Sequence, residues 1–212
     1  MRIRRQRFLR LVSVLTLSVL VPLAFASAAS GRAQHVRWDI ISFTGTAPLT
    51  FNPGGFAEAK APKSTGTHDP AFDSRIRLTG SGTFVAPAGH NGGSNAVAGG
   101  GTWQTFNSAG VSTGSGTYKV KELVTFEFAG FQTGTFTDNI GDTNERANGT
   151  AVLRIEYQDG TRGVLMVGCH GPGAPDGIVE GIAVTKGFTT YDLVQTPLPG
   201  VDANRTIFHV SR

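Results

Sequence analysis

The sequence predicts an all-β protein: a single antiparallel β-barrel of about nine strands, preceded by a helical signal peptide. Glycine supplies 29 of the 212 residues, roughly double its usual share, while 39% of the residues are still apolar. Apolar and polar side chains alternate in many short segments, as they do in strands that bury one face. No segment after residue 30 shows sustained helical spacing. These observations together favour short strands joined by glycine-rich turns.

Residues 1–30 have the order of a secretory signal peptide, with a basic head, an apolar stretch and small residues. The apolar stretch, residues 11–25, is 15 residues long, which is short of the roughly 20 that a spanning helix needs. We therefore expect cleavage within 24–33, no membrane span afterwards, a single all-β domain over 31–212, and a periplasmic or extracellular location. The basic region consists of Arg2, Arg4, Arg5, Arg7 and Arg10.

Removing the leader changes the charge of the chain. The whole sequence carries 19 basic and 15 acidic residues, a net charge of +4, and five of those arginines lie in the first ten residues. The remaining part has 14 basic and 15 acidic groups. The positive charge therefore belongs to the targeting segment, and we expect no nucleic-acid partner.

Strand patterns begin directly after the leader. Alternation over 36–43 predicts the first strand, 56–61 a short second one, and 76–84 a longer one with its apolar residues on one face. The intervening residues 62–73 are rich in proline, glycine and aspartate and predict a surface loop.

A Gly-Thr-aromatic triplet then recurs at spacings of 19, 15 and 18 residues. We interpret it as one device in which glycine permits a bend or a close strand approach, threonine covers the wet face, and the ring fills the interior. Such bends are what closure of a sheet requires. One copy, Gly101-Thr102-Trp103, resembles the Gly-x-Trp signature of lipocalin-type barrels, where it lies on the first strand; no ligand residues are transferred from it. The four copies begin at Gly82, Gly101, Gly116 and Gly134.

The second half of the chain continues the strand pattern. Residues 107–110 predict a hairpin turn, 124–128 a strand, and the polar stretch 130–149 a long loop. Asp159-Gly160 lies between two alternating runs and favours a hairpin with a type I′ turn. The remaining strands are expected at 153–157, 164–167, 178–184, 188–191 and 206–210, with Gly181 and Gly187 as possible bulges.

The last predicted strand, 206–210, could pair with the first, 36–43. Such pairing would close the sheet and remove the edges at which strands of different molecules aggregate. We therefore favour the barrel, with a two-sheet β-sandwich as the alternative.

Cysteine and histidine offer few candidates for chemistry. A single cysteine excludes an internal disulfide, and we expect Cys169 to be a buried small apolar residue. Cys169 and His170 are adjacent, so on a strand they would face opposite sides and could not form a thiolate–imidazole pair. His35 and His209 would approach each other if the first and last strands pair, but no histidine spacing matches a metal motif.

The polar loop 138–145 contains the main metal candidate, and a site at His35 and His209 is the other. Asp138, Asp142 and Asn144 supply the oxygen ligands that calcium prefers, although their spacing does not match the helix–loop–helix calcium pattern. A solvated turn with Asx hydrogen bonds is the simpler interpretation. We otherwise expect no cofactor.

The sequence contains no catalytic constellation, although strands could bring Glu127, Glu156 or Glu180 together. The leading hypothesis is an exported, non-enzymatic barrel that binds a small apolar or amphipathic ligand or has a structural role. The alternatives are an extracytoplasmic hydrolase or isomerase on the same barrel, and a cell-surface or matrix interaction protein. An apolar cavity above roughly 300 Å³ would favour a binding protein. Buried acids or histidines that converge on one site would favour an enzyme. A filled interior together with an exposed apolar patch would favour an interaction protein.

Overall fold

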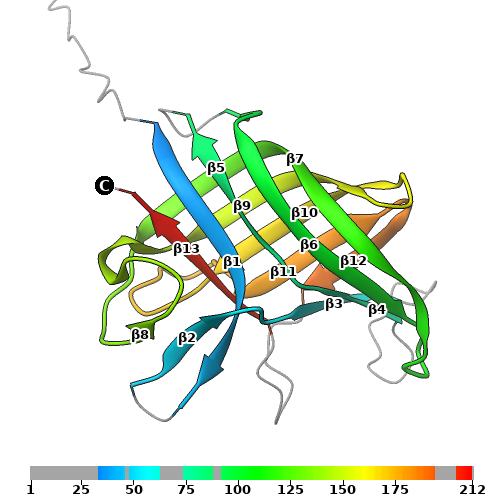
Figure 1. The fold of residues 1–212 in the computed structure, drawn as a ribbon, viewed down its shortest axis with the longest axis horizontal. Coiled ribbons are helices and arrows are strands. Elements are labelled where there is room, and N and C mark those ends of the chain that lie inside the picture. Colours follow the sequence, from blue (N-terminus) through cyan, green and yellow to red (C-terminus); the bar gives the residue numbers. More distant parts are fainter. Residues whose placement is uncertain (1–32, 46–47, 63–73, 88–91, 194–203, 212) are drawn as a thin grey trace, which may run out of the picture.

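The structure, a computed structural model, describes residues 33–45, 48–62, 74–87, 92–193 and 204–211. The predictions for the leader and for most of the loop at 62–73 lie outside these residues. The described chain forms one sheet closed into a ten-stranded antiparallel barrel, as predicted (Figure 1). Its single helical element is a 3₁₀ turn, Thr143–Glu145. Among the described residues, no helix has the length and apolar character needed to cross a membrane.

The described residues contain thirteen strands rather than about nine. The difference arises because some predicted strands are interrupted and short strands lie outside the barrel. The strands are β1 Gln34–Thr44, β2 Thr50–Pro53, β3 Ala57–Ala61, β4 Ser74–Leu78, β5 Ser81–Ala86, β6 Val97–Phe106, β7 Ser112–Phe131, β8 Thr137–Asp138, β9 Arg146–Tyr157, β10 Arg162–Cys169, β11 Gly181–Lys186, β12 Thr189–Leu193 and β13 Arg205–Val210.

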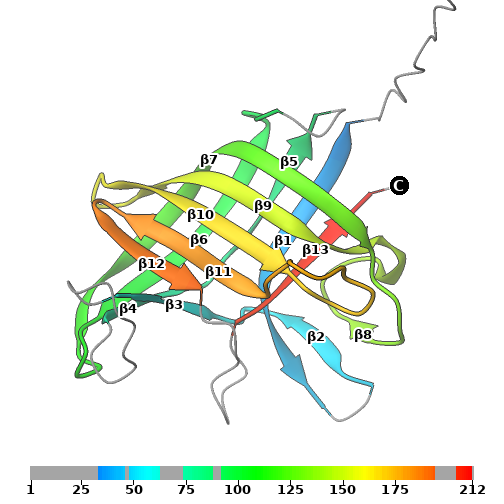
Figure 2. The same ribbon diagram turned by 180° about the vertical axis from the view of Figure 1, so that it is seen from behind.

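The barrel closes along two routes that share the wall β6–β7–β9 (Figures 1 and 2). Towards one end, β9 pairs with β10, and the sheet continues through β11, β12 and β3 to β4. Towards the other end, β9 pairs with β13, and the sheet continues through β1 to β5. The predicted pairing of the last strand with the first is confirmed, with Val36 opposite Val210 and Ile40 opposite Thr206.

The divergence of the two routes explains why the predicted strand 76–84 is divided. β4 pairs with β3, whereas β5 pairs with β1. Both strands pair with β6 along their other edge. At the break, Thr79 N donates to Thr102 O (3.0 Å) and Ile40 N donates to Gly80 O (2.9 Å). Backbone hydrogen bonding is therefore maintained while the strand changes partner, which alternation alone could not reveal.

Three of the four Gly-Thr-aromatic triplets place their ring in the barrel interior as predicted, and the fourth does not. A Cβ on Gly82 would lie 2.3 Å from Ala98 O, and one on Gly101 would lie 1.9 Å from Thr79 O, so both glycines permit a close backbone approach. The rings of the first three triplets are buried in the barrel core: Phe84, Trp103 and Tyr118. The fourth ring, Phe136, packs outside the barrel against a second apolar cluster.

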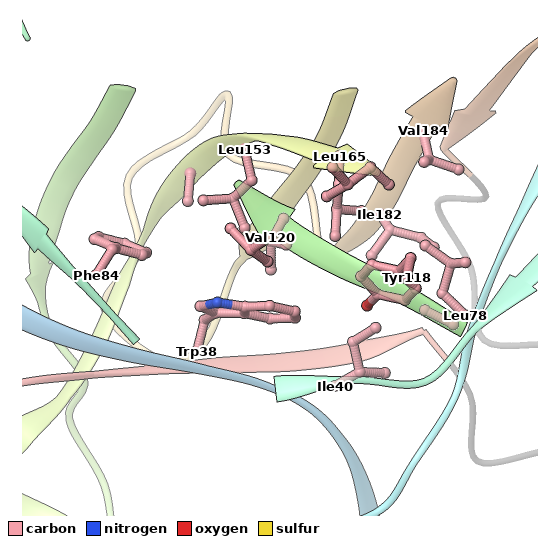
Figure 3. Packing of buried hydrophobic residues seen from close by; sticks show 14 of the residues in the cluster. Trp38, Ile40, Leu78, Phe84, Tyr118, Val120, Leu153, Leu165, Ile182 and Val184 are labelled. Carbon is pink, nitrogen blue, oxygen red and sulfur yellow. The ribbon is translucent and has the colours of Figure 1, made fainter. Parts of the chain in front are cut away.

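Side chains fill the barrel interior. Alternate residues of β1, namely Val36, Trp38 and Ile40, point inwards and join a continuous apolar cluster to which every strand of the two closure routes contributes. Figure 3 shows the Trp38 indole lying across this interior near Tyr118. The fold therefore provides a rigid, packed scaffold, one of the two states that barrels of about this size adopt.

Two turns differ in detail from the prediction. Gly160 N donates to Tyr157 O (2.9 Å) and Tyr157 N to Thr161 O (2.9 Å), with Gly160 at φ +83° and Asp159 outside the positive-φ region. The β9–β10 connection is thus a type I turn followed by a left-handed glycine, not type I′, which needs positive φ at both central residues. Gly187, at φ +59°, is a turn residue between the paired Lys186 and Thr189, not a bulge.

The predicted loop 130–149 is shorter in the structure. β7 continues to Phe131, and β9 already begins at Arg146. Arg146 and Asn148 are buried strand residues. Their polarity made this part of β9 resemble a loop in the sequence.

A small outer layer covers one side of the barrel. β2 and β8 pair in parallel and lie outside the barrel near β1 (Figures 1 and 2). Ile41 of β1 and Ile207 of β13 project outwards and pack with Phe51 of β2 in a second apolar cluster. This layer positions the candidate site.

Candidate functional site

A cavity of about 200 Å³ lies beside the second apolar cluster, where β1 and β13 meet the outer layer. We call it the side pocket. One part of its lining is apolar and the other polar. The apolar part consists of Ile41, Phe43, Phe51, Phe136, Pro172 and Ile207, and the polar part includes Gln132, Cys169, His170, Glu180, Arg205 and Thr206.

Three stacked rings form the apolar wall. Phe51 lies between Phe43 and Phe136, with ring centroids 4.9 Å and 5.0 Å apart and interplanar angles of 16° and 27°. Guanidinium groups lie over both ends of this stack: Arg205 is 5.0 Å from the Phe43 centroid and Arg146 is 5.0 Å from that of Phe136. These cation–π contacts hold the rings in place and keep positive charge next to the pocket.

Glu180 is the acidic group of the side pocket. It lies just before β11, and its two oxygens accept from Thr206 N (2.7 Å) and His170 N (2.6 Å). Burial raises the pKa of Glu180, although these hydrogen bonds and the charge of Arg205 oppose the shift. A carboxyl group with a raised pKa beside a cavity can bind a ligand or exchange a proton with it.

The raised pKa of Glu180 predicts how stability depends on pH. The folded state holds this proton more tightly than the unfolded state, so the stabilisation is complete below the ordinary pKa of 4.5 and is lost as pH rises through the folded pKa. We expect urea midpoints to show this loss in the wild type and a flatter profile in Glu180→Gln. The same slope in both proteins would contradict this assignment.

Cys169 and Gln132 complete the polar wall. Cys169 is buried, as predicted, and burial raises the pKa of its thiol well above the usual range. Gln132 Nε2 donates to Cys169 Sγ (3.2 Å) and to Ala147 O (3.4 Å). The adjacent His170 directs Nδ1 to Ile178 O (2.7 Å). Cys169 is therefore held as a thiol and lacks the character of a nucleophile.

A polar clasp holds segment 132–145 against the barrel. Asp138 Oδ2 lies 2.9 Å from His209 Nε2, and Arg37 contacts Asp39 (2.7 Å, Nε–Oδ2) and donates to Ile140 O (3.1 Å). Burial would raise the pKa of Asp138, but hydrogen bonds from His209 and two backbone amides lower it overall. The clasp places Phe136 over the barrel and so shapes the side pocket.

The calcium-loop candidates have other partners in the structure. Asp138 also accepts from the backbone amides of Ile140 (2.9 Å) and Gly141 (3.2 Å), while Asp142 accepts from Asn144 N (2.8 Å) in an Asx-type turn. Across the described residues, no three His, Cys, Asp or Glu side chains come together as a metal site. The loop therefore carries no metal proposal here.

A second, more open depression of about 660 Å³ lies on the other side of the clasp. His35 and His209 both line it, so pairing of β1 with β13 brings them to the same side of the sheet as expected, but His35 is exposed whereas His209 is buried. His209 is already engaged by Asp138, and Glu145 and Arg37 also line this depression. Its lining mixes charges of both signs, which does not define a ligand class.

The acids considered for paired-carboxylate chemistry are not gathered at the side pocket. Glu127 lies opposite Thr150, and Glu156 lies opposite Lys119 six residues further along β9, which separates them by about 20 Å at the usual strand rise. Only Glu180 of the three lines the side pocket. Gln132 and Arg205 were missed by sequence reasoning, since no spacing or motif marks them.

No known family model matches the chain, and neither the curated proteins nor the solved structures contain a match. The site is therefore interpreted from its own geometry.

Proposed function

We propose that this protein is an exported β-barrel that binds a small, single-ring amphipathic molecule in the side pocket. The carrying observation is the joint presence of a stacked aromatic wall and a polar wall around one cavity. An apolar cavity of roughly 150 Å³ is large enough for benzene. A pocket of about 200 Å³ therefore suits one ring with a polar substituent.

The proposed ligand lies on the outer side of the barrel, whereas small ligand-binding barrels usually hold their ligand in the interior. The interior is occupied by core side chains such as Trp38 and Tyr118. At about 200 Å³ the side pocket is below the roughly 300 Å³ typical of ligand sites, so its lining rather than its volume supports the proposal. In this proposal the barrel is a rigid support, and the outer layer supplies the specificity.

A test can use toluene, phenol and benzamide as probes, with binding followed by saturation-transfer NMR on the full protein after export. Ile207 is fully buried and lines the side pocket. We expect Ile207→Phe, which fills the cavity, to abolish binding of all three probes, whereas Val111→Phe at an exposed hairpin position should leave binding unchanged. Thermal unfolding of both variants checks that they are folded.

A second variant enlarges the same cavity instead of filling it. Phe51→Ala removes the central ring of the stack, so it should admit naphthalene, which the wild type excludes. Failure of every single-ring probe to bind at millimolar concentration, or binding that Ile207→Phe leaves intact, would overturn the proposed function.

An extracytoplasmic enzyme is the second candidate, and Glu180 is the observation that favours it. A carboxyl group whose pKa is raised by burial keeps its proton to a higher pH than an ordinary glutamate, so it can act as a proton donor to a bound ligand. Conversion of a bound single-ring compound by the wild type, lost in Glu180→Gln while binding persists, would favour this candidate. Binding without any conversion would favour the first.

A further inference from the structure

We propose that the outer wall formed by β7, β9 and β10 docks on an anionic phospholipid surface, with a basic cavity against the headgroups and the ring of Phe188 inserted beside them. This surface shares no residue with the side pocket, so the inference does not depend on the proposed ligand. It follows from the charges around the cavity and from the apolar side chains exposed next to it.

The cavity, of about 240 Å³, lies where β7, β9 and β10 run side by side (Figure 2). Arg154 and Arg162 line it from strand positions that alternate with core residues, so both face outwards. Lys121 lines it because of a bulge in β7, where the register with β9 passes from Val120 directly to Glu122. Three cationic side chains therefore border one exposed cavity.

Acidic side chains neutralise only part of this charge. Glu122 Oε2 lies 2.9 Å from Arg154 Nε, which makes a direct ion pair. Glu156, the one acid in the cavity lining, is 3.9 Å from Lys121 Nζ and 45% exposed, so this contact is loose and open to water.

Two further basic residues flank Glu156 in the sheet register, Lys119 on β7 and Arg162 on β10, and neither has an ion pair in the described part of the chain. The wall thus carries four basic and two acidic side chains, which leaves ten basic and thirteen acidic residues elsewhere in 31–212. Lys186 and Asp159 at the same end bind each other and add no net charge. The positive excess is therefore local to this wall.

Exposed apolar side chains adjoin the basic wall. Of the three large apolar residues that are exposed in the described residues, two lie next to Arg162. Val164 follows it on the same face of β10, and Phe188 is fully exposed in the two-residue turn between β11 and β12. Gly187 N donates to Arg162 O (3.3 Å), which holds this turn beside the start of β10.

A lipid surface fits this combination better than a protein or an acidic polymer. A standard protein interface covers about 800 Å² on each partner, whereas a ring at the tip of a short turn is narrow and convex. An acidic polymer would match the charges but would not use the ring. At a bilayer surface, basic side chains attract anionic headgroups while a neighbouring aromatic ring enters the boundary with the acyl chains.

Co-sedimentation of the full protein after export with phospholipid vesicles tests the proposal. We expect vesicles of phosphatidylcholine with about one-third phosphatidylglycerol to bind at least about five-fold more protein than pure phosphatidylcholine, and added salt to weaken the binding. Equal binding to both vesicle types, or binding to neither, would overturn the proposal.

Two substitutions assign the contact to this wall. Phe188→Ala should weaken partitioning into the mixed vesicles about ten-fold, and Arg162→Gln about five-fold. The control is Lys60→Gln, because Lys60 lies on β3 opposite Asp192, outside the cavity, and should partition like the wild type. Thermal unfolding checks that all three variants are folded. If either Phe188→Ala or Arg162→Gln partitions like the wild type, the proposal is wrong.

Phe188→Trp separates lipid insertion from binding of anions in general. The two native tryptophans are buried, so the new indole dominates any response to the vesicles. We expect its emission to move to shorter wavelength with the mixed vesicles and to stay unchanged with polyglutamate or inorganic phosphate. An equal shift with polyglutamate, or none with vesicles, would show that the basic wall binds anions without entering a bilayer, and the lipid proposal would be rejected.

Discussion

Replacement of Trp103 by alanine is expected to destabilise the protein by about 3–5 kcal/mol. Trp103 is 7% exposed, and its ring meets Tyr157 edge-on at 5.8 Å. Lys186 Nζ also lies 4.3 Å from the centroid of the indole ring, so truncation removes a cation–π contact together with the buried area. The melting temperature should fall by about 6–20 °C for a domain of this size.

The measurement is favourable because the chain has two tryptophans. In Trp103→Ala the remaining indole, Trp38, is fully buried and reports on unfolding by fluorescence. Phe188→Ala is the matched control, since Phe188 is fully exposed at the β11–β12 turn and its truncation should be close to neutral. A Trp103→Ala protein that unfolds at the wild-type midpoint would show that this ring is not part of the core.

Period-2 alternation was sufficient to predict an all-β fold, but by itself it left a barrel and a two-sheet β-sandwich both open. Val36, Trp38 and Ile40 alternate with polar residues in the sequence and point into the core in the structure. The pairing of β1 with β13 was also predictable, because an all-β chain with a strand near each end can remove its edges in this way. Arg146 shows where alternation fails, since a buried arginine in a strand is indistinguishable from a loop residue until its carbonyl partners are known.

The side pocket could not be predicted because its residues meet only through the outer layer. Gln132, Glu180 and Arg205 come from segments that are 48 and 25 residues apart in sequence. Segment 132–145 crosses the outer faces of β1 and β13, and the buried Asp138–His209 contact helps to hold it there. A contact between distant segments leaves no local spacing in the sequence. Glu180 alone was named as a candidate, and then only as one of three carboxylates.

Gly101→Ala is expected to be as damaging as the loss of a core ring, although it adds only one methyl group. The new Cβ would lie 1.9 Å from Thr79 O and 2.7 Å from Gly80 Cα. Both contacts are backbone atoms at the break between β4 and β5, so no side-chain rotation can relieve them and β6 must move away from its neighbour. We expect destabilisation of more than about 3 kcal/mol, at or beyond the upper end of ordinary overpacking.

Gly114→Ala separates this steric effect from the general response of strand glycines. Gly114 lies on β7, and a Cβ there would meet Trp103 ring atoms and Thr105 Oγ1 at 3.3–3.4 Å, contacts that small side-chain shifts can accommodate. We expect urea midpoints to fall steeply in Gly101→Ala and to change little in Gly114→Ala. Equal midpoints in the two variants would mean that strand separation at Thr79–Gly80 is not limiting. The two closure routes would then diverge at the β4–β5 break for a reason other than the close approach of β6.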